Sequence, residues 1–407
     1  MLCRQQNIRG YPSLLFYNPN GATTKFTGPK EEEELMEFIV KNLPDYWFRM
    51  RKSSYESTTQ GIDRGQIKDS SWVIFFCSSN NFQCPELTER RLLSHTLNGL
   101  VNVGIIDCEE DEEFCTDQTG GDLGVFFFKS SKDALNSDAA HKLTTENIKD
   151  TRREVLDLLP DVPNLDDEKY SKVRIKLEDD LGPGWLIHFV FGKDGDHPDE
   201  KVIQPQIGKI MFGKVDCFKC AEACKELFLK KPQYVMFKVG GGFEFYYGRE
   251  EPSDVIEFAR VSNQARTMTT LAGSDFPDVI HANGAFIDFF APWCPPCLNL
   301  LPEFRKASIN VGGSIIFGTV DCTIYGSICN QFNIRSYPTT VFFNMSKPHY
   351  YHGHHTADDL SEFVMEILRP SVMNLNYADF QNQVAGKPEN EVWLVDFFAP
   401  CKQPLKN

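Results

Sequence analysis

Residues 285–297 read Ala285-Phe-Ile-Asp-Phe-Phe-Ala-Pro-Trp-Cys-Pro-Pro-Cys297, and a helical pattern follows them. An apolar strand therefore runs directly into two cysteines that stand three residues apart at a helix start. Such a pair can close a small disulfide and reopen it, and the helix N-terminus favours the thiolate that attacks disulfides. Zinc sites use the same spacing, so a metal-binding or structural pair is the alternative to redox chemistry.

Four residues around this segment have predicted roles in redox chemistry. Cys294 comes first and is the predicted nucleophile, whereas Cys297 lies one turn into the helix and would resolve a mixed disulfide. Burial in the apolar strand should raise the pKa of Asp288 and let it exchange a proton with Cys297, unless its carboxyl reaches solvent. Pro338 precedes an apolar strand and is a candidate for a cis peptide bond, with a trans turn as the alternative.

The chain repeats itself at a distance that corresponds to a whole small domain. An Asp-Cys pair followed by six residues and a second Cys occurs three times, beginning at Asp107, Asp216 and Asp321. An aromatic-x-Gly with two apolar residues at helical spacing also occurs three times, beginning at Phe26, Tyr246 and Tyr351. These matched offsets predict repeated units of one fold.

The repeat divides the chain into five predicted pieces, of which the first and last are incomplete units. The pieces are the C-terminal half of a unit (1–51), a second unit (52–162), a third unit (163–264), the redox unit with the Cys-x-x-Cys pair (265–370) and the start of a further unit (371–407). In the second unit the offsets place Asn80 and Gln83 at the cysteine positions and Ile74 at the position of Asp288. The second and third units should therefore keep the fold without the chemistry.

The remaining cysteines suggest structural disulfides. The Asp-Cys pairs recur in units that lack an active motif, so they are candidates for bonds that tie a strand end to the following helix. The candidates are Cys108 with Cys115, Cys217 with Cys224, Cys322 with Cys329, and Cys77 with Cys84. Paired cysteines at this density indicate an oxidising compartment.

Composition narrows the possible partners and cofactors. The formal net charge of −15 disfavours binding to nucleic acid or to an anionic membrane surface. No apolar run approaches the length that a membrane-spanning helix needs, and no signal peptide or retrieval signal is recognised. Cys217, Cys220 and Cys224 lack a nearby fourth ligand, so we predict neither a metal site nor a cofactor.

Together, the Cys-x-x-Cys motif, the buried acid and the proline resemble the redox site of the thioredoxin superfamily. The order of the units along the chain resembles that of the J-domain disulfide reductases in the protein disulfide isomerase family. The resemblance assigns Trp293, Cys294, Cys297, Asp288 and Pro338 to one redox site. It implies an α/β fold of tandem thioredoxin-like domains, each with a central mixed sheet flanked by helices. It also implies a location in the endoplasmic reticulum lumen.

The activity implied by this resemblance is protein-disulfide reduction in misfolded client proteins, which would aid their folding or degradation. Pro295 and Pro296 replace the Gly-His of a protein disulfide isomerase, which favours reduction over oxidation because no histidine stabilises the thiolate. An Hsp70 chaperone is a partner within the family, but we recognise no J domain in this chain. The alternative is a non-catalytic fragment that binds substrates or serves as a scaffold.

Overall fold

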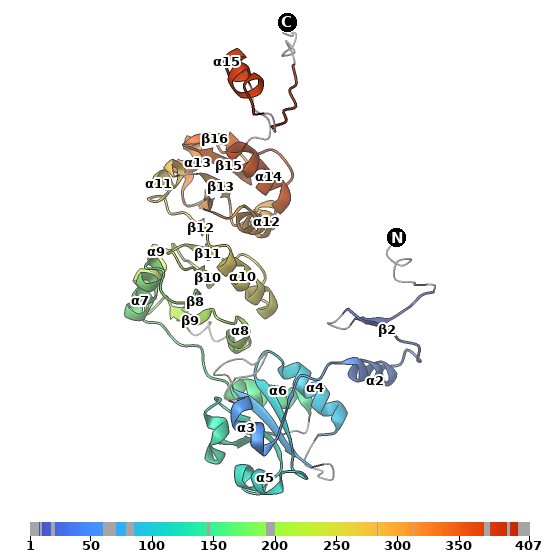
Figure 1. Ribbon diagram of the computed structural model, residues 1–407. Helices are drawn as coiled ribbons and strands as arrows, with labels where there is room; N and C mark the ends of the chain where they lie inside the picture. The colour runs from blue at the N-terminus through green and yellow to red at the C-terminus, as the bar shows by residue number, and fades with distance from the viewer. Residues whose placement is uncertain are drawn as a thin grey trace.

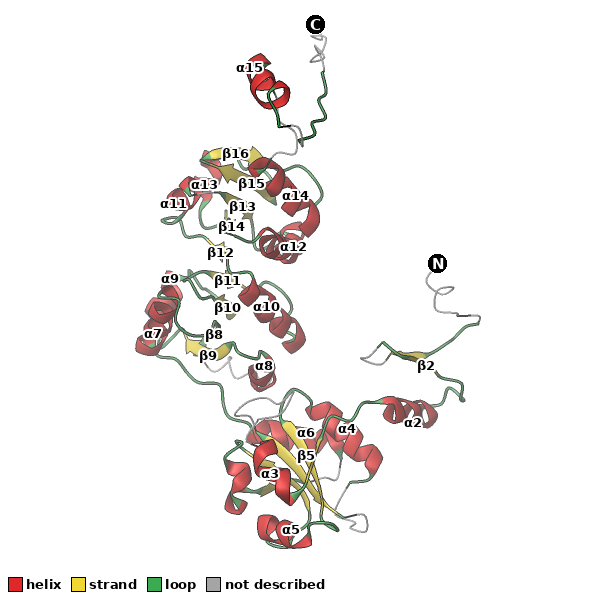
Figure 2. Ribbon diagram, viewed as in Figure 1, coloured by secondary structure: helices red, strands yellow, loops and turns green. Residues whose placement is uncertain are grey.

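A computed structural model of the chain describes residues 8, 10–17, 21–59, 71–78, 85–144, 147–192, 200–282, 284–313, 315–369, 375–388 and 391–397. The second, third and redox units follow one another along the chain as separate α/β bodies (Figure 1). Each has strands in its interior and helices on its outside (Figure 2). This arrangement is the predicted tandem α/β fold.

The redox unit contains a five-stranded mixed sheet with the order β12-β14-β13-β15-β16. β12, β14 and β13 are parallel, β15 is antiparallel to β13, and β16 is antiparallel to β15. The strands are β12 (Met268–Thr270), β13 (Ala285–Phe290), β14 (Ile316–Asp321), β15 (Thr339–Asn344) and β16 (Lys347–Tyr350). The helices are α11 (Phe276–His281), α12 (Pro295–Val311), α13 (Gly326–Gln331) and α14 (Ala357–Leu368).

Both faces of this sheet are covered, which explains why its central strand is apolar. All six residues of β13 are buried. Alternate side chains of a strand point to opposite faces, and Phe286 packs against Phe304 of α12 on one face, whereas Phe289 packs against Phe276 of α11 on the other. A strand buried on both faces needs a nearly continuous apolar run, so Asp288 is the exception that requires an explanation.

The second unit has the same topology, with the sheet order β3-β5-β4-β6-β7. Its strands are β3 (Phe48–Met50), β4 (Trp72–Cys77), β5 (Asn102–Asp107), β6 (Gly124–Phe128) and β7 (His141–Lys142). Its helices are α3 (Lys52–Thr59), α4 (Leu87–Leu97), α5 (Glu112–Thr119) and α6 (Ile148–Leu158), with the short 3-10 turns η1 (Asp133–Leu135) and η2 (Ser137–Ala139). Because β3 pairs in parallel with β5, this sheet begins before the predicted boundary at residue 52.

The third unit has the sheet order β11-β10-β8-β9. Its strands are β8 (Trp185–Val190), β9 (Met211–Asp216), β10 (Gln233–Phe237) and β11 (Phe243–Phe245). Its helices are α7 (Asp167–Glu178), α8 (Glu200–Gln206), α9 (Ala221–Glu226) and α10 (Pro252–Gln264). A single parallel bridge between Asn164 and Lys214 takes the place that β3 and β12 have in the other two sheets.

The two end pieces are smaller. β1 (Leu15–Tyr17) and β2 (Thr23–Lys25) form an antiparallel pair that precedes α2 (Glu32–Asn42), as expected for the second half of a unit. Near the C-terminus, α15 (Tyr377–Asp379) continues into the π-helix η4 (Phe380–Ala385). The apolar pattern of residues 392–398 suits a strand, but the described residues 391–397 form no strand and leave Leu394 fully exposed. They have no neighbouring strand to pair with in the described part of the chain.

The repeated Asp-Cys pairs have the same structural role in all three units. Disulfides join Cys108 to Cys115, Cys217 to Cys224, and Cys322 to Cys329, with Cα–Cα distances of 5.7–5.8 Å. Each bond links the end of a strand to the next helix. The preceding aspartate accepts a hydrogen bond from the backbone N–H two residues later, which holds the turn in place. Cys77 is also disulfide-bonded, and its predicted partner Cys84 lies outside the described residues.

Candidate redox site

The two cysteines of the motif lie at the N-terminus of α12. Cys294 is the N-cap residue, and its Sγ accepts a hydrogen bond from the backbone N–H of Cys297 at 3.4 Å. The two cysteines form a disulfide. Cys294 keeps 5% of its surface exposed, whereas Cys297 is fully buried. This order of exposure suits Cys294 as the attacking residue and Cys297 as the resolving residue, although Cys294 faces solvent only through a small opening.

Asp288 lies on the same face of β13 as Phe286 and Phe290, the face that packs against α12. Its side chain is fully buried, and neither carboxyl oxygen has a hydrogen-bond partner. Burial raises the pKa of this carboxyl to about 8, so it is protonated over much of the neutral range. A carboxyl with this pKa, on the cysteine side of the sheet, can take up and return a proton near pH 7.

The loop before β15 faces the disulfide. The Tyr337–Pro338 peptide bond is cis, as is Tyr11–Pro12 in the first piece of the chain. The carbonyl oxygen of Tyr337 lies 3.6 Å from the Sγ of Cys294. Trp293 is 71% exposed, and its ring packs against that of Tyr337 with a centroid distance of 6.1 Å. The five residues predicted for the site therefore lie on three neighbouring segments of the redox unit.

The second and third units lack this constellation in the described residues. Strand register places Phe75 of β4, and not the predicted Ile74, at the position of Asp288, because Phe75 pairs with Ile105 two residues before Asp107 as Asp288 pairs with Thr319 two residues before Asp321. Ile74 lies on the opposite face of the sheet, and Asn80 and Gln83 lie outside the described residues. In the third unit, strand register places His188 at this position, because it pairs with Lys214 of β9 just as Asp288 pairs with Thr319 of β14. No group of His, Cys, Asp or Glu residues in the described ranges is arranged to hold a metal ion.

The sequence did not predict that the third unit contributes to the site. Phe290, Ala291, Cys294 and Cys297 form one apolar cluster, and Tyr247 of the third unit packs against it. The Tyr247 ring lies 5.7 Å from that of Phe290 between centroids. Tyr247 follows the repeated aromatic position at Tyr246, but no pattern in the sequence distinguishes it as a contact to another unit.

A cleft of about 960 Å³ lies between the third unit and the redox unit, next to the cysteine motif. One wall includes Phe228 and Tyr247, and the other includes Pro292, Ile324 and Tyr325. Phe228 and Ile324 are 54% and 43% exposed. The cleft therefore presents apolar surface two residues away from Cys294.

None of the helices in the described residues is long and apolar enough to cross a membrane.

Comparison with known proteins identifies similar chains. Residues 267–366 match the thioredoxin family. The whole chain is 33% identical over 416 residues to DnaJ homolog subfamily C member 10 of Homo sapiens and covers 51% of that protein. A shorter match, 34% identical over 130 residues, is to protein disulfide isomerase-like 2-2 of Oryza sativa subsp. japonica, and it covers 29% of this chain and 34% of that one.

A His-Pro-Asp tripeptide, which is typical of J domains, does occur in this chain at His197–Asp199. It falls between β8 and α8 of the third unit, among residues 193–199, which lie outside the described residues. The elements on either side belong to a thioredoxin-like sheet and its helices. The tripeptide therefore does not mark a J domain here.

Solved structures agree with the sequence matches. The crystal structure of ERdj5 form II superimposes with a TM-score of 0.69 at 30% identity, covering 96% of this chain and 52% of that one. The crystal structure of full-length ERdj5 gives a TM-score of 0.62 at 30% identity, covering 93% and 53%. The chain thus spans about half the length of the relatives it matches. The chain is a tandem thioredoxin-fold protein that resembles, along its whole length, about half of DnaJ homolog subfamily C member 10.

Proposed function

We propose that the chain is a thiol–disulfide oxidoreductase of the endoplasmic reticulum that reduces disulfides in client proteins. The observation that carries this proposal is the Cys294–Cys297 disulfide at the N-terminus of α12, on the side of the sheet that holds the unpartnered acid Asp288. The structural disulfides of the other units support an oxidising compartment. The similarity to DnaJ homolog subfamily C member 10 and to a protein disulfide isomerase supports the same activity class.

In the first step, the Cys294 thiolate of the reduced protein attacks one sulfur of a client disulfide. A new S–S bond joins Cys294 to the client, and the second client sulfur leaves as a thiolate that takes a proton from water. The position of Cys294 at the helix N-terminus favours this step, because the helix dipole and the free N–H groups stabilise a negative sulfur.

In the second step, Cys297 resolves the mixed disulfide. In the fraction of molecules in which Asp288 is ionised, its carboxylate accepts the thiol proton of Cys297, whose thiolate then attacks the Sγ of Cys294. The client sulfur leaves as a thiolate and is protonated, so the client gains two electrons and two protons in total. The Cys294–Cys297 disulfide re-forms, and an external thiol such as glutathione must reduce it before the next cycle.

Reduction is the proposed direction because two prolines stand between the cysteines. Pro295 and Pro296 supply no cationic side chain or hydrogen-bond donor that would stabilise the Cys294 thiolate. A less stabilised thiolate makes the dithiol form less stable and the pair a better reductant. Reduction of misfolded clients would help them to refold or to be degraded.

A purely structural role as a binding scaffold is the second candidate, since the second and third units have the fold without the cysteine pair.

The trapping variant Cys297→Ala tests this mechanism. We expect it to accumulate a covalent adduct between Cys294 and a disulfide-containing client, because the resolving thiol is missing. Non-reducing electrophoresis followed by mass spectrometry of the linked peptides measures the adduct. The double variant Cys294→Ala/Cys297→Ala is the control. Trapping by Cys294→Ala in place of Cys297→Ala would show that the two roles are reversed, and trapping by neither would favour the scaffold.

A glutathione titration tests the direction of the reaction. We expect a reduction potential between about −270 and −200 mV, at the thioredoxin side of the range for such proteins. A potential more positive than about −180 mV, which is the value for protein disulfide isomerase, would rule out the reductase assignment.

A further inference from the structure

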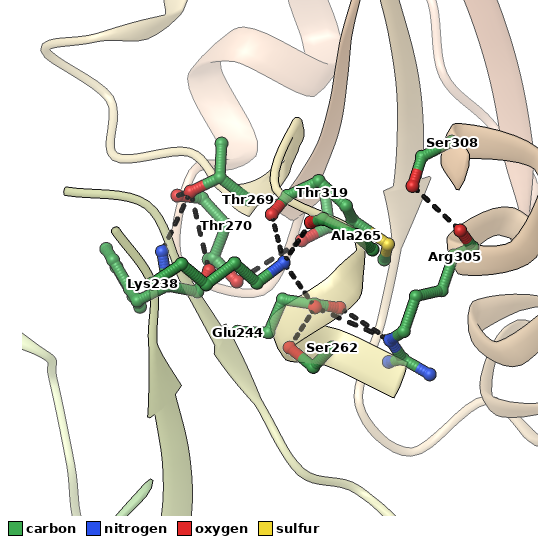
Figure 3. A network of polar contacts seen from close by, with 11 residues as sticks. Lys238, Glu244, Ser262, Ala265, Thr269, Thr270, Arg305, Ser308 and Thr319 are labelled. Atoms are coloured by element: carbon green, nitrogen blue, oxygen red, sulfur yellow. Dashed lines mark hydrogen bonds and ion pairs between the residues drawn. The ribbon is translucent and has the colours of Figure 1, made fainter. Parts of the chain in front are cut away.

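The third unit and the redox unit are joined by a buried ionic network (Figure 3). The carboxylate of Glu244 on β11 lies 2.6 Å from the Nζ of Lys238 and 3.0 Å from the Nε of Arg305. These three side chains are at most 8% exposed. Ser262 of α10 donates a hydrogen bond to the same carboxylate. Because Arg305 belongs to α12, the network connects the third unit directly to the helix that begins with the redox pair.

The network also holds the segment where the chain passes from one unit to the next. The Nζ of Lys238 donates hydrogen bonds to the carbonyl oxygen of Ala265 at 2.7 Å and to that of Met268. Burial would raise the pKa of Glu244, but Arg305 and Lys238 outweigh it and hold that pKa below its usual value. Glu244 is therefore ionised at neutral pH. A carboxylate held by two cations in a buried interface fixes the relative position of the two units.

A second contact from the same segment reaches the redox pair. Tyr247 stands three residues after Glu244, and its ring packs against the cluster of Phe290, Ala291, Cys294 and Cys297. Burial, together with the nearby Asp321, raises the pKa of the Tyr247 hydroxyl, so this side chain stays neutral. One segment of the third unit thus contacts the middle of α12 through Glu244 and the cysteine cluster through Tyr247.

We propose that the third unit completes the redox site of its neighbour, with Tyr247 as a positioning residue that closes the apolar cluster around Cys294 and Cys297. The inference rests on the proposed function and assigns a role to a unit whose sequence has no cysteine between β8 and α8, where the redox unit has Cys294 and Cys297. Tyr247 keeps water away from one side of the cluster, and the Glu244 network holds Tyr247 in that place. The reduction equilibrium of the pair then depends on a residue outside the redox unit.

The direction of this dependence follows from solvation. The disulfide is neutral, whereas the reduced pair contains a thiolate that is better solvated by water than by an apolar cluster. Removal of the Tyr247 ring would admit water and stabilise the reduced pair. The glutathione equilibrium should therefore shift toward the dithiol.

The test is a glutathione titration of the full chain, with the redox state of Cys294 and Cys297 read by alkylation and peptide mass spectrometry. We expect Tyr247→Ala to shift the equilibrium constant toward the dithiol by at least about threefold. Tyr247→Phe keeps the ring and should stay within about twofold of the wild type. Tyr246→Ala is the matched control, because the Tyr246 ring packs on Phe258 inside the third unit.

The outcomes separate this inference from the proposed function. An unchanged equilibrium in Tyr247→Ala, or an equal shift in Tyr246→Ala, would overturn the role of Tyr247 while leaving a redox-active pair. A pair that never equilibrates with glutathione in the wild type would contradict the function itself. If Tyr247→Ala does not fold, Tyr247→Thr replaces it, since threonine removes the ring and leaves the cluster open to water while it suits an extended backbone. A shift smaller than twofold in that folded variant would also overturn the inference.

Discussion

His188 of the third unit and Asp288 of the redox unit occupy the same position in equivalent strands, yet their surroundings are opposite. The Nδ1 of His188 lies 2.6 Å from one carboxyl oxygen of Glu200, and the other oxygen lies 2.7 Å from the Nζ of Lys214. The His188 ring also stacks on Tyr234 at 4.0 Å between centroids. Asp288 has no hydrogen-bond partner on either oxygen.

This difference supports a structural role for His188 and the proposed chemical role of Asp288. A buried polar group with partners costs the fold little, whereas one without partners costs the full desolvation free energy. In the second unit the apolar side chain of Phe75 is buried at this position, so no polar group has to be compensated there. Among the residues that the structure describes, Asp288 is the only buried acid without a hydrogen-bond partner, and it lies in the unit that contains the Cys294–Cys297 disulfide.

Replacing Glu200, which binds both His188 and Lys214, should have the largest effect on stability. In Glu200→Gln, His188 and Lys214 lose the carboxylate between them, so we expect the third unit to lose on the order of 3–5 kcal/mol in its free energy of opening. Native-state hydrogen exchange of the β8 amides measures this quantity. Glu222→Gln removes the exposed partner of Lys225 and should change it by less than about 0.5 kcal/mol. If the β8 amides were equally protected from exchange in Glu200→Gln and Glu222→Gln, the buried partners of His188 would not contribute to stability as the comparison states.

Replacing Asp288, the buried acid without a hydrogen-bond partner, should raise the stability of the redox unit, whereas Glu200→Gln lowers that of the third unit. Because burial raises the pKa of Asp288 to about 8, the folded redox unit holds a proton that the unfolded chain releases near pH 4. The stability of the wild type should therefore fall as pH rises from about 4 to 8. Asp288→Asn should stabilise the redox unit by on the order of 2–4 kcal/mol at pH 7 and by little at pH 4.

Hydrogen exchange of the β13 amides at several pH values tests this prediction, and single-turnover kinetics tests its functional counterpart. Asp288→Asn should slow the resolution of the mixed disulfide, since no group then accepts the Cys297 proton. Asp278→Asn, which changes an exposed acid of the same unit, is the control. A stability gain that is the same at pH 4 and pH 7 would show that ionisation of Asp288 is not the cause.

The structural disulfides should contribute similar amounts in units with and without chemistry. Replacing Cys108 and Cys115 by alanine opens a loop of the same length as replacing Cys322 and Cys329 by alanine. Each double replacement should lower the free energy of unfolding of its own unit by about 2–3 kcal/mol. Urea unfolding followed by hydrogen exchange measures both losses. Loss of reductase activity in the Cys322/Cys329 variant with no loss of stability would indicate that this pair takes part in the chemistry.

Local patterns were enough to select the five residues of the candidate site, because the features that mark them are local. A Cys-x-x-Cys pair between a strand and a helix, an acid in an apolar strand and a proline before another strand are all visible in short segments. The interface residues were missed for the opposite reason. Glu244 stands between Phe243 and Phe245 and looks like the exposed position of an alternating strand, but the neighbouring unit buries it. Only the docking of two units reveals such a residue.

The smallest expected effect concerns the cleft beside the motif, which both units line. A client chain whose disulfide reaches Cys294 would lie next to Pro292, and we expect its apolar side chains to contact Phe228 and Ile324. Phe228→Ser or Ile324→Ser should lower kcat/KM for a protein disulfide by about three- to tenfold, since each removes an apolar contact worth about 1 kcal/mol. Reduction of oxidised glutathione should be unchanged, because it is too small to span the cleft. Ile175→Ser alters an exposed apolar side chain of the third unit outside the cleft and should change neither rate. Equal losses for both substrates would mean that the substitutions disturb the redox pair and not client binding.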